Sequence, residues 1–529
     1  MCGIVGCYQQ ADGGKLVDIM SERIAHRGPD SAGAWSHEDD RSVVHLGFRR
    51  LSIIDLSTAA DQPLTKDGLT ITYNGELYNY RSLRAELAAQ GVRFRTQSDT
   101  EVVLEAWRRW GPSALKRFRG MFAFALFDER TGELVLARDP FGIKPLYYLP
   151  RGEGAVYASE LKALTAAVGS ELRVEPGAMV ASLLYFWVPE ERCPIEGVRK
   201  LPGGSWALLR PDGTITEQQY WNIAEVAAEA AAGPPADLGA VIEESVAAHL
   251  VADVPVSSFL SGGLDSSIVT VLAHRAAQEI DAYTITFRPE DQRLEAMPDD
   301  AIYARKVAEQ FGIKLHEIEI SPDIVGLLPR MVDALDEPIG DPAAINTLLM
   351  CEAARERGVK VILSGMGADE LFGGYRKHVA CLMAGQYGRL PAGLRAGVRA
   401  GRQFSPAGDQ QQAGRARVRQ GVAAGYITSG TASLMVTALG TVVIALTART
   451  GWMLHWLHPG QQLSAARAYH ESLMASVGVY GYIVVLAFVP GIGLLLGWIG
   501  GGVTARPGTA AGPTPPGGLE LASADADGP

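Results

Sequence analysis

The sequence predicts an α+β domain with a layered, largely antiparallel sheet, then an α/β domain with a parallel sheet, then a C-terminal pair of apolar helices. Short β-rich runs separated by turn dipeptides fill the chain up to about residue 210. From about residue 235 to 385, apolar strands alternate with helical segments. Two long uncharged runs follow near the end of the chain. These three observations give the order of the parts.

Size and composition describe a multidomain globular protein that acts on small molecules. At 529 residues the chain has room for about three units, at one domain per ~150 residues. Apolar residues make up 47% and charged residues 20%, and the net charge of −11 gives no sign of a nucleic-acid surface. The five cysteines are scattered without a CxxC pair, so we expect neither a disulfide framework nor a zinc site. The N-terminus lacks a signal-peptide pattern, so we expect the catalytic domains in the cytoplasm.

Five apolar runs of the first part are predicted to be strands. In chain order they are VVHLGF, LTITYN, MFAFALFD, ELVLARD and AVYAS. The dipeptides Asp67-Gly68 and Thr131-Gly132 lie between such runs and are typical of turns. This pattern indicates a sheet domain of short antiparallel strands.

The second part alternates between strands and helices. The apolar run VPVSSFL precedes the helical run SSIVTVLAHRAAQ, and the strand AYTITF precedes the helix AIYARKVAEQFG. A further strand, VKVILSG, follows near residue 360. Alternation of this kind is typical of a parallel sheet covered by helices.

The C-terminal part has a different character. Residues 396–430 are rich in arginine with little apolar periodicity, which predicts a linker. Residues 431–500 contain two uncharged runs, 431–448 and 473–499, that approach or pass the ~20 residues needed to cross a bilayer. They predict a two-helix membrane hairpin with the preceding arginines on its cytoplasmic side, and the alternative is a buried hairpin in a soluble core. Residues 501–529 are rich in Pro, Gly and Ala and then acidic, which predicts a disordered tail.

A cysteine directly follows the initiator methionine. Removal of that methionine would place the Cys2 thiol and a free α-amine on one residue, and the amine could then act as general base for the thiol. The alternative is an ordinary buried cysteine in an edge strand. Four later segments carry polar groups suited to a small amino acid, and they favour the nucleophile. These segments are RGPD at 27–30, RRLSIID at 49–55, YNGELYNY at 73–80 and SDTE at 98–101.

On these motifs the first 210 residues resemble the class II glutamine amidotransferase domain of the N-terminal-nucleophile family, which implies an αββα sandwich. The resemblance implies that Arg50 pairs with the α-carboxylate of L-glutamine. It implies that Glu76 and Asp99 hold the ammonium group of glutamine. It also implies an oxyanion hole made by the Asn74 amide and the Gly75 N–H, worth ~3 kcal/mol per donor. Taken alone, the Asn-Gly pair favours a hairpin turn.

The string SGGLDSS, at 261–267, lies between an apolar strand and a helical run. Glycines let backbone N–H groups approach phosphate, and a helix N-terminus favours negative charge. The string resembles the pyrophosphate loop of the ATP-pyrophosphatase family and lacks the Lys-Ser or Lys-Thr of a Walker loop. The resemblance implies cleavage of ATP to AMP and pyrophosphate, with Asp265 as a ligand of Mg2+. The alternative for Asp265 is a solvated helix cap.

Two later segments, DEPIGDPAAINT at 336–347 and LSGMGADELFGGY at 363–375, resemble the same family. The resemblance implies that Asp369 is a second Mg2+ ligand. Leu260 and Ile285 either line the adenine site or are plain core residues. The implied nucleotide-binding residues are Leu260, Ser261, Gly262, Gly263, Asp265, Ser266, Ile285, Ser364 and Gly365.

The motifs of the second domain resemble those of the asparagine synthetases, but the chain departs from the typical pattern of that family in two places. Typical members have SGEG, whose glutamate is thought to assist proton removal as ammonia attacks the acyl-adenylate. This chain has Met366 there, and a thioether cannot accept that proton as a carboxylate can. The resemblance also ends near residue 400, and the usual C-terminal helical part has no counterpart in the sequence.

Together the motifs are similar to those of the glutamine-hydrolysing asparagine synthetase family, with a glutaminase domain at 1–210 and an ATP-binding synthetase domain at 220–395. The resemblance implies that ATP, L-aspartate and L-glutamine give AMP, diphosphate, L-asparagine and L-glutamate through an acyl-adenylate and channelled ammonia. Two alternatives stay open. One is amidation of another carboxylate, such as a cell-envelope sugar acid or a secondary metabolite. The other is a non-catalytic, membrane-tethered sensor of glutamine and nucleotide. Membrane association and a homodimer are also left open.

Overall fold

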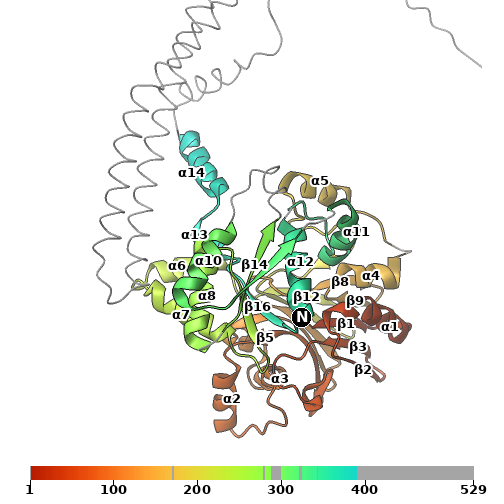
Figure 1. Cartoon of the computed structure of the whole chain (residues 1–529). Coiled ribbons are helices and arrows are strands. Elements are labelled where there is room, and N and C mark those ends of the chain that lie inside the picture. The colour runs from red at the N-terminus through yellow and green to blue at the C-terminus, as the bar shows by residue number, and fades with distance from the viewer. Residues whose placement is uncertain are drawn as a thin grey trace, which may run out of the picture. The chain divides into compact units, whose positions relative to one another are not determined.

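The computed structural model describes residues 2–169, 172–277, 280–287, 300–320, 324–341 and 343–389 (Figure 1). The chain divides into two compact units, Met1–Phe372 and Gly373–Pro529, and the described part of the second is residues 373–389, which include helix α14 (Arg376–Arg389). No helix within the described ranges is both long and apolar enough to span a bilayer. The predicted linker at 396–430, the apolar runs within 431–500 and the tail at 501–529 lie outside the described residues.

Two six-stranded sheets form the first part of the larger unit, and every strand pair in them is antiparallel. The first sheet has the order β10 (Arg199–Lys200), β8 (Tyr147–Arg151), β9 (Gly154–Ala158), β1 (Gly3–Tyr8), β3 (Val43–Arg50), β2 (Ser31–Glu38). The second has the order β12 (Ile215–Gln219), β11 (Ser205–Leu209), β7 (Glu133–Arg138), β6 (Gly120–Asp128), β5 (Leu69–Leu77), β4 (Leu64–Lys66).

Three hydrophobic clusters show how these sheets are layered. The middle cluster joins side chains of β1 and β3 to side chains of β6 and β7, so the two sheets pack face to face. A second cluster packs α1 (Gly13–Arg23) and α4 (Leu161–Val168) on the outer face of the first sheet. The third packs α2 (Tyr80–Ala89) and α3 (Asp99–Trp110) on the outer face of the second sheet. The predicted αββα sandwich is therefore confirmed.

The five strands predicted in this domain are all present, as β3, β5, β6, β7 and β9. Asp67 and Gly68 have φ of 48° and 77°, which the tight turn between β4 and β5 requires. The hairpin turn predicted from the Asn74-Gly75 pair alone is not present in the structure. Both residues lie inside β5, where they pair with Ala123 and Phe122 of β6, because the long apolar neighbour strand overrides the local turn preference.

Five smaller elements complete this part of the described chain. They are the 3-10 helices η1 (Ala25–Arg27), η2 (Thr58–Ala60) and η3 (Gly111–Arg117), and the helices α5 (Pro176–Tyr185) and α6 (Ile223–Ala231).

A four-stranded, wholly parallel sheet forms the second domain, as predicted. Its order is β15 (Leu315–Ile320), β14 (Ala282–Phe287), β13 (Val256–Phe259), β16 (Val361–Leu363). The helices are α7 (Leu238–His249), α8 (Leu264–Ala277), α10 (Asp300–Phe311), α11 (Ile324–Leu335), α12 (Ala343–Glu356) and α13 (Ala368–Phe372). Helices α8 and α10 pack on one face of the sheet and α12 on the other (Figure 1). Loops leaving β13 and its neighbour at the sheet edge, β16, therefore meet where the carboxyl ends of these paired parallel strands lie.

Candidate functional site

One pocket in the first domain gathers all six residues that the sequence assigns to the glutaminase site. Its lining contains Cys2, Arg50, Asn74, Gly75, Glu76 and Asp99. They come from four different elements: the start of β1, the end of β3, the interior of β5 and the first turn of α3. The sandwich therefore brings together residues that are up to 97 positions apart in the chain, the separation of Cys2 and Asp99.

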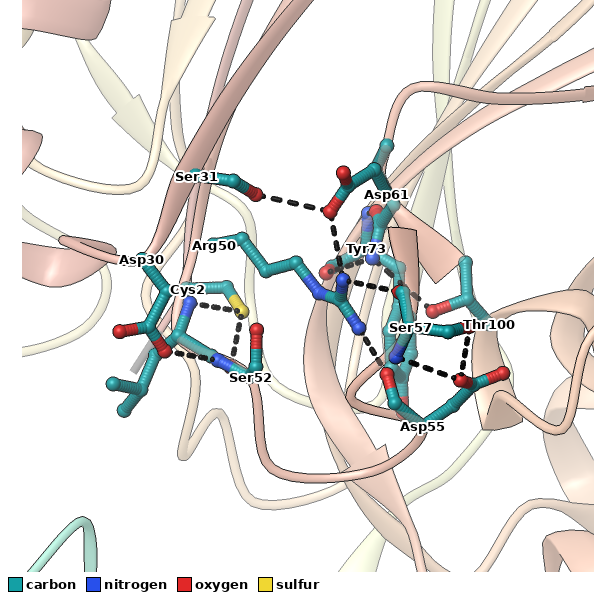
Figure 2. Close-up of polar contacts among 12 residues, drawn as sticks. Cys2, Asp30, Ser31, Arg50, Ser52, Asp55, Ser57, Asp61, Tyr73 and Thr100 are labelled. Carbon is teal, nitrogen blue, oxygen red and sulfur yellow. Dashed lines mark hydrogen bonds and ion pairs between the residues drawn. The ribbon is translucent and has the colours of Figure 1, made fainter. Parts of the chain in front are cut away.

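The Cys2 thiol lies against the backbone of Leu51, next to Ser52 in Figure 2. The Leu51 N–H faces Sγ at 3.4 Å and the Leu51 carbonyl lies 3.6 Å from it. Burial raises the pKa of this thiol, and its hydrogen bond with Leu51 lowers it in part. The thiol thus needs a nearby base to become a thiolate at neutral pH.

Two buried charges fix the backbone of Cys2. The Arg27 Nε donates to the Cys2 carbonyl at 2.9 Å, and its guanidinium pairs with the Glu160 carboxylate at 2.7 Å. Both side chains are 7% exposed. Burial by itself would raise the pKa of Glu160, but the hydrogen bond from His26 and the charge of Arg27 hold it down, at about 2. Glu160 is therefore ionised and keeps Arg27 in place.

Arg50 is the last residue of β3, and its side chain is 7% exposed. Figure 2 shows its guanidinium among Ser57, Asp55 and Asp61. It donates to the Ser57 carbonyl at 2.9 Å, to the Asp61 carboxylate at 2.7 Å and to the Asp55 carbonyl. These bonds hold a planar cation at the pocket, where it could pair with a carboxylate.

Glu76 and Asp99 place two carboxylates at the same pocket. Burial raises the pKa of Glu76 to about 7, with Lys144 opposing and Asp99 adding to the shift. Burial also raises the pKa of Asp99, to about 6, although the N–H groups of Leu77 and Thr100 lower it. The two carboxylates favour a cationic ligand, which would relieve their mutual repulsion.

The N-terminus of α3, which carries Asp99, is stabilised by a side-chain cap and by a buried ion pair. Ser98 caps the helix by accepting the Thr100 N–H at 3.1 Å. Glu101 accepts the N–H of Thr96 at 2.7 Å and the ammonium of Lys66 at 2.8 Å. Its side chain is 1% exposed, so the preceding loop is held from inside the protein.

Asn74 offers unused hydrogen-bonding atoms. It is 1% exposed, and within the described ranges neither its Oδ1 nor its Nδ2 has a hydrogen-bond partner. A buried amide in this state is costly unless a ligand satisfies it. The neighbouring position requires glycine, because a Cβ at Gly75 would lie 2.5 Å from the Met121 carbonyl oxygen of β6. Asn74 and Gly75 thus line the pocket as neighbours, with the Asn74 amide unpaired.

Lys144 is a pocket residue that sequence patterns did not single out. It is 3% exposed, and its N–H donates to Asp139 at 2.9 Å in the loop between β7 and β8. Burial lowers the pKa of Lys144 to about 8, and the charges of Glu76 and Cys2 raise it in part. The only signal in the sequence is a lysine inside the apolar string FGIKPLYY, which is weak by itself.

The glycine-rich loop at 261–267 follows β13 and opens α8, as predicted. Gly262 has φ of 79°, and a Cβ there would lie 2.6 Å from the Ala304 nitrogen of α10. The Ser266 hydroxyl closes the loop, because Ser261 donates its N–H to Oγ at 3.2 Å. The first N–H groups of α8 have no partner within the helix and are suited to an anion.

The loop after β16 touches this loop directly. A Cβ at Gly365 would lie 2.8 Å from the Ser266 nitrogen and 2.9 Å from the Asp265 Cβ. Burial raises the pKa of Asp265, and the charges of Asp369 and Glu370 raise it further. Asp265 and Asp369 thus act on each other electrostatically at one edge of the sheet.

This arrangement fits Mg2+ bound together with phosphate oxygens. Within the described part of the chain, no group of three or more His, Cys, Asp or Glu side chains is arranged to hold a metal by itself. Mg2+ commonly takes one or two carboxylates and completes its shell with phosphates and water.

The structure also shows how buried three other residues named in the sequence analysis are: Leu260, Ile285 and Met366. Leu260 is fully buried in the cluster with Val271 and Ala282, and Ile285 packs against the cluster of Tyr283. The Leu260 side chain is thus a core residue with no open face toward a nucleotide. Met366 is 77% exposed at the start of the loop that follows β16.

Comparison with known proteins divides the chain between the two antiparallel sheets and the parallel-sheet domain. Residues 1–221 match the family model of a glutamine amidotransferase domain, and residues 237–476 match that of asparagine synthase. The second match continues well past residue 400, where the motifs recognised in the sequence end.

Three relatives illustrate the similarity. The chain is 39% identical to asparagine synthetase (glutamine-hydrolyzing) 1 of Bacillus subtilis, over 75% of this chain and 62% of the relative. It is 38% identical to a Mycobacterium tuberculosis protein named for the same activity, over 75% and 63%. It is 30% identical to a Methanocaldococcus jannaschii protein likewise named, over 75% and 79%. The chain thus spans less than two thirds of the length of the first two.

Proposed function

Because the chain belongs to the family of glutamine-hydrolysing asparagine synthetases, we propose that it transfers the amide nitrogen of L-glutamine to L-aspartate at the expense of ATP. The products are L-asparagine, L-glutamate, AMP and diphosphate. The observation that carries the proposal is the single pocket holding Cys2, Arg50, Asn74, Glu76 and Asp99. The two touching loops at the carboxyl edge of the parallel sheet supply a second, separate centre.

In the first half-reaction, Arg50 binds the α-carboxylate of glutamine, and Glu76 and Asp99 bind its ammonium. Once Met1 is removed, the α-amine of Cys2 takes the thiol proton, and the thiolate attacks the side-chain amide carbon. The Asn74 amide and the Gly75 N–H stabilise the oxyanion. Ammonia leaves with the proton, and water then hydrolyses the thioester to glutamate.

In the second half-reaction, the side-chain carboxylate of aspartate attacks the α-phosphorus of ATP and diphosphate leaves. The residues proposed to hold the nucleotide are Ser261, Gly262, Gly263, Ser266, Ser364 and Gly365, through backbone N–H groups and hydroxyls. Mg2+ bound by Asp265 and Asp369 would neutralise phosphate charge. Ammonia from the first pocket attacks the acyl-adenylate, and AMP leaves.

The test is mass-spectrometric detection of products from the full-length chain given aspartate, ATP, Mg2+ and glutamine. We expect asparagine, AMP and glutamate in equal amounts. Glutamate without AMP or asparagine would contradict aspartate as the acceptor and leave the glutamine reaction standing.

One observation favours a second acceptor. Met366 is exposed where typical members have a glutamate, so proton removal from the attacking ammonia needs another group or another substrate. The second candidate function is amidation of a different carboxylate by the same two half-reactions. AMP formed with a sugar acid or a secondary-metabolite acid, and not with aspartate, would select it.

The raised carboxylate pKa values predict how glutamine hydrolysis depends on pH. Glu76 has a pKa of about 7, so below that pH it takes up a proton and no longer attracts the glutamine ammonium. We expect kcat/KM for glutamine to fall about tenfold per pH unit below pH 7, because kcat/KM reports groups of the free enzyme. Asp99, with a pKa of about 6, steepens the fall at lower pH.

A pH profile of glutaminase kcat/KM from pH 5.5 to 8.5 checks this. At saturating glutamine, the part of the fall that comes from Glu76 should be absent from kcat, because the bound ammonium keeps Glu76 ionised. In the variant Glu76→Gln, the fall in kcat/KM that begins near pH 7 should be absent. Equal kcat/KM at pH 6 and pH 8 in the unmodified chain would be incompatible with the assignment.

A further inference from the structure

One wall of the glutamine pocket is a short loop, residues 51–55, which we call the wall loop. Leu51, Ile53 and Ile54 line the pocket, and the N–H and the carbonyl of Leu51 both contact the Cys2 sulfur. The loop directly follows Arg50, the last residue of β3. Its conformation therefore sets the space around both the nucleophile and the carboxylate-binding arginine.

The last residue of the wall loop, Asp55, holds a strained conformation by several hydrogen bonds. Its φ is 53°, in the left-handed region that a non-glycine residue seldom adopts. Its carbonyl accepts from the Arg50 guanidinium. One carboxylate oxygen accepts the Gln97 N–H at 2.7 Å, and the other accepts the Ser57 hydroxyl at 2.6 Å. Asp55 thus ties Arg50 to the segment that leads into Asp99.

The second domain supplies the contact that completes this arrangement. Asp253 accepts the Asp55 N–H on Oδ2 at 2.7 Å, and its own N–H donates to the Ile53 carbonyl at 2.9 Å. A bond between a carboxylate and a backbone N–H is charge-assisted and stronger than a neutral one. Asp253, a residue of the second domain, therefore forms two hydrogen bonds with the wall loop.

A second contact lies beside the first. Lys360 donates to Asp30 Oδ2 at 2.7 Å, and the same oxygen accepts the Ser52 N–H at 2.8 Å. Asp253 stands just before β13 and Lys360 just before β16, and these strands are paired through Val256 and Val361. The wall loop is thus held at the amino ends of two adjacent strands whose carboxyl ends lead to Ser261 and Ser364.

We propose that Asp253 is a positioning residue for the glutamine pocket, contributed by the ATP-binding half of the chain. It fixes Asp55, and through Asp55 it fixes Arg50 and the approach to Asp99. Lys360 supports the same loop less directly, because it acts through Asp30, which accepts the Ser52 N–H. The inference rests on the proposed function to the extent that the ligand of the pocket is glutamine.

The test compares glutamine affinity in full-length variants carrying Cys2→Ala, so that bound glutamine is not consumed. By calorimetry, Asp253→Ala should weaken glutamine binding about fivefold, because one charge-assisted hydrogen bond to the wall loop is lost. Asp253→Asn keeps an acceptor oxygen and should restore most of the affinity. Lys360→Ala should weaken binding about twofold. With Cys2 intact, Asp253→Ala should raise KM for glutamine by a similar factor and leave kcat within about twofold.

Glu244→Ala is the matched control. Glu244 on α7 also bridges the two domains, through an exposed ion pair with Arg119, yet it does not touch the wall loop. It should leave glutamine affinity unchanged. Unchanged affinity in Asp253→Ala, or an equal loss in Glu244→Ala, would overturn the proposal. A chain that binds glutamine but forms no amide would instead overturn the proposed function, and the affinity comparison would still decide the role of Asp253.

Discussion

Cys2→Ala abolishes glutamine-dependent amide synthesis and leaves ammonia-dependent synthesis intact: this is the largest effect we expect from a single substitution. The thiol is the only group proposed to form a covalent bond with glutamine. Its loss removes the reaction path, so we expect a decrease in glutaminase kcat of at least about 10³-fold. The nucleotide loops lie at a separate centre, so added ammonium salts should still give AMP and amide. Glutamate release and AMP formation, measured with each nitrogen source, check both halves.

Cys7→Ala provides the matched control for this substitution. Cys7 lies on the same strand, β1, but its side chain is buried in the cluster beneath α1 and does not line the pocket. We expect glutamine use to survive, with a modest loss of stability from the small cavity. If Cys2→Ala destroyed both activities in a folded protein, separate centres joined by ammonia transfer would be refuted.

Asp265→Asn is expected to stop product formation from either nitrogen source. The substitution keeps the size and hydrogen-bonding capacity of the side chain and removes the charge that binds Mg2+ beside the phosphates. We expect ATP/pyrophosphate exchange with the acceptor to fall at least about 10²-fold. Glutamine hydrolysis should persist, because the Cys2 pocket contains no residue of the 261–267 loop.

Asp281→Asn controls for the loss of a carboxylate in the same domain. Asp281 precedes β14, at the opposite edge of the sheet, and pairs with Lys314 and His316. Exchange should continue in this variant. Normal exchange in Asp265→Asn would show that Asp265 is the helix cap that the sequence leaves as its alternative.

The glutaminase pocket was predictable because its residues lie in short strings with unusual polar content. The structure brings Cys2, Arg50, Asn74, Glu76 and Asp99 to one pocket, and their roles stay predictions. The strands around them were predictable too, since their apolar runs are long and bounded by turn dipeptides. Local sequence failed at Asn74-Gly75, where pairing with β6 decides the conformation.

Other features could not be predicted because they depend on distant segments. Lys144 becomes a pocket residue only when the loop after β7 folds back beside Glu76. Asp253 is an ordinary acidic residue in VADVPV until the fold places it 2.7 Å from the Asp55 nitrogen. Strand β15, LHEIEI, mixes charged and apolar residues because its edge position leaves part of it exposed. The predicted membrane spans concern residues beyond those described, and the asparagine synthase match covers the first of them and reaches the start of the second.

The grip of Asp253 on the wall loop has a consequence for how this chain could be taken apart or recombined. A fragment ending near residue 221, where the amidotransferase match stops, would retain every proposed glutamine-binding side chain. It would nevertheless lack the partner of the Asp55 N–H, and so would a chimera whose synthetase half had no carboxylate at position 253. The proposal therefore predicts that the glutaminase domain, expressed alone or fused to another synthetase domain, binds glutamine more weakly than it does in this chain. Part of its affinity for glutamine depends on the domain that follows it.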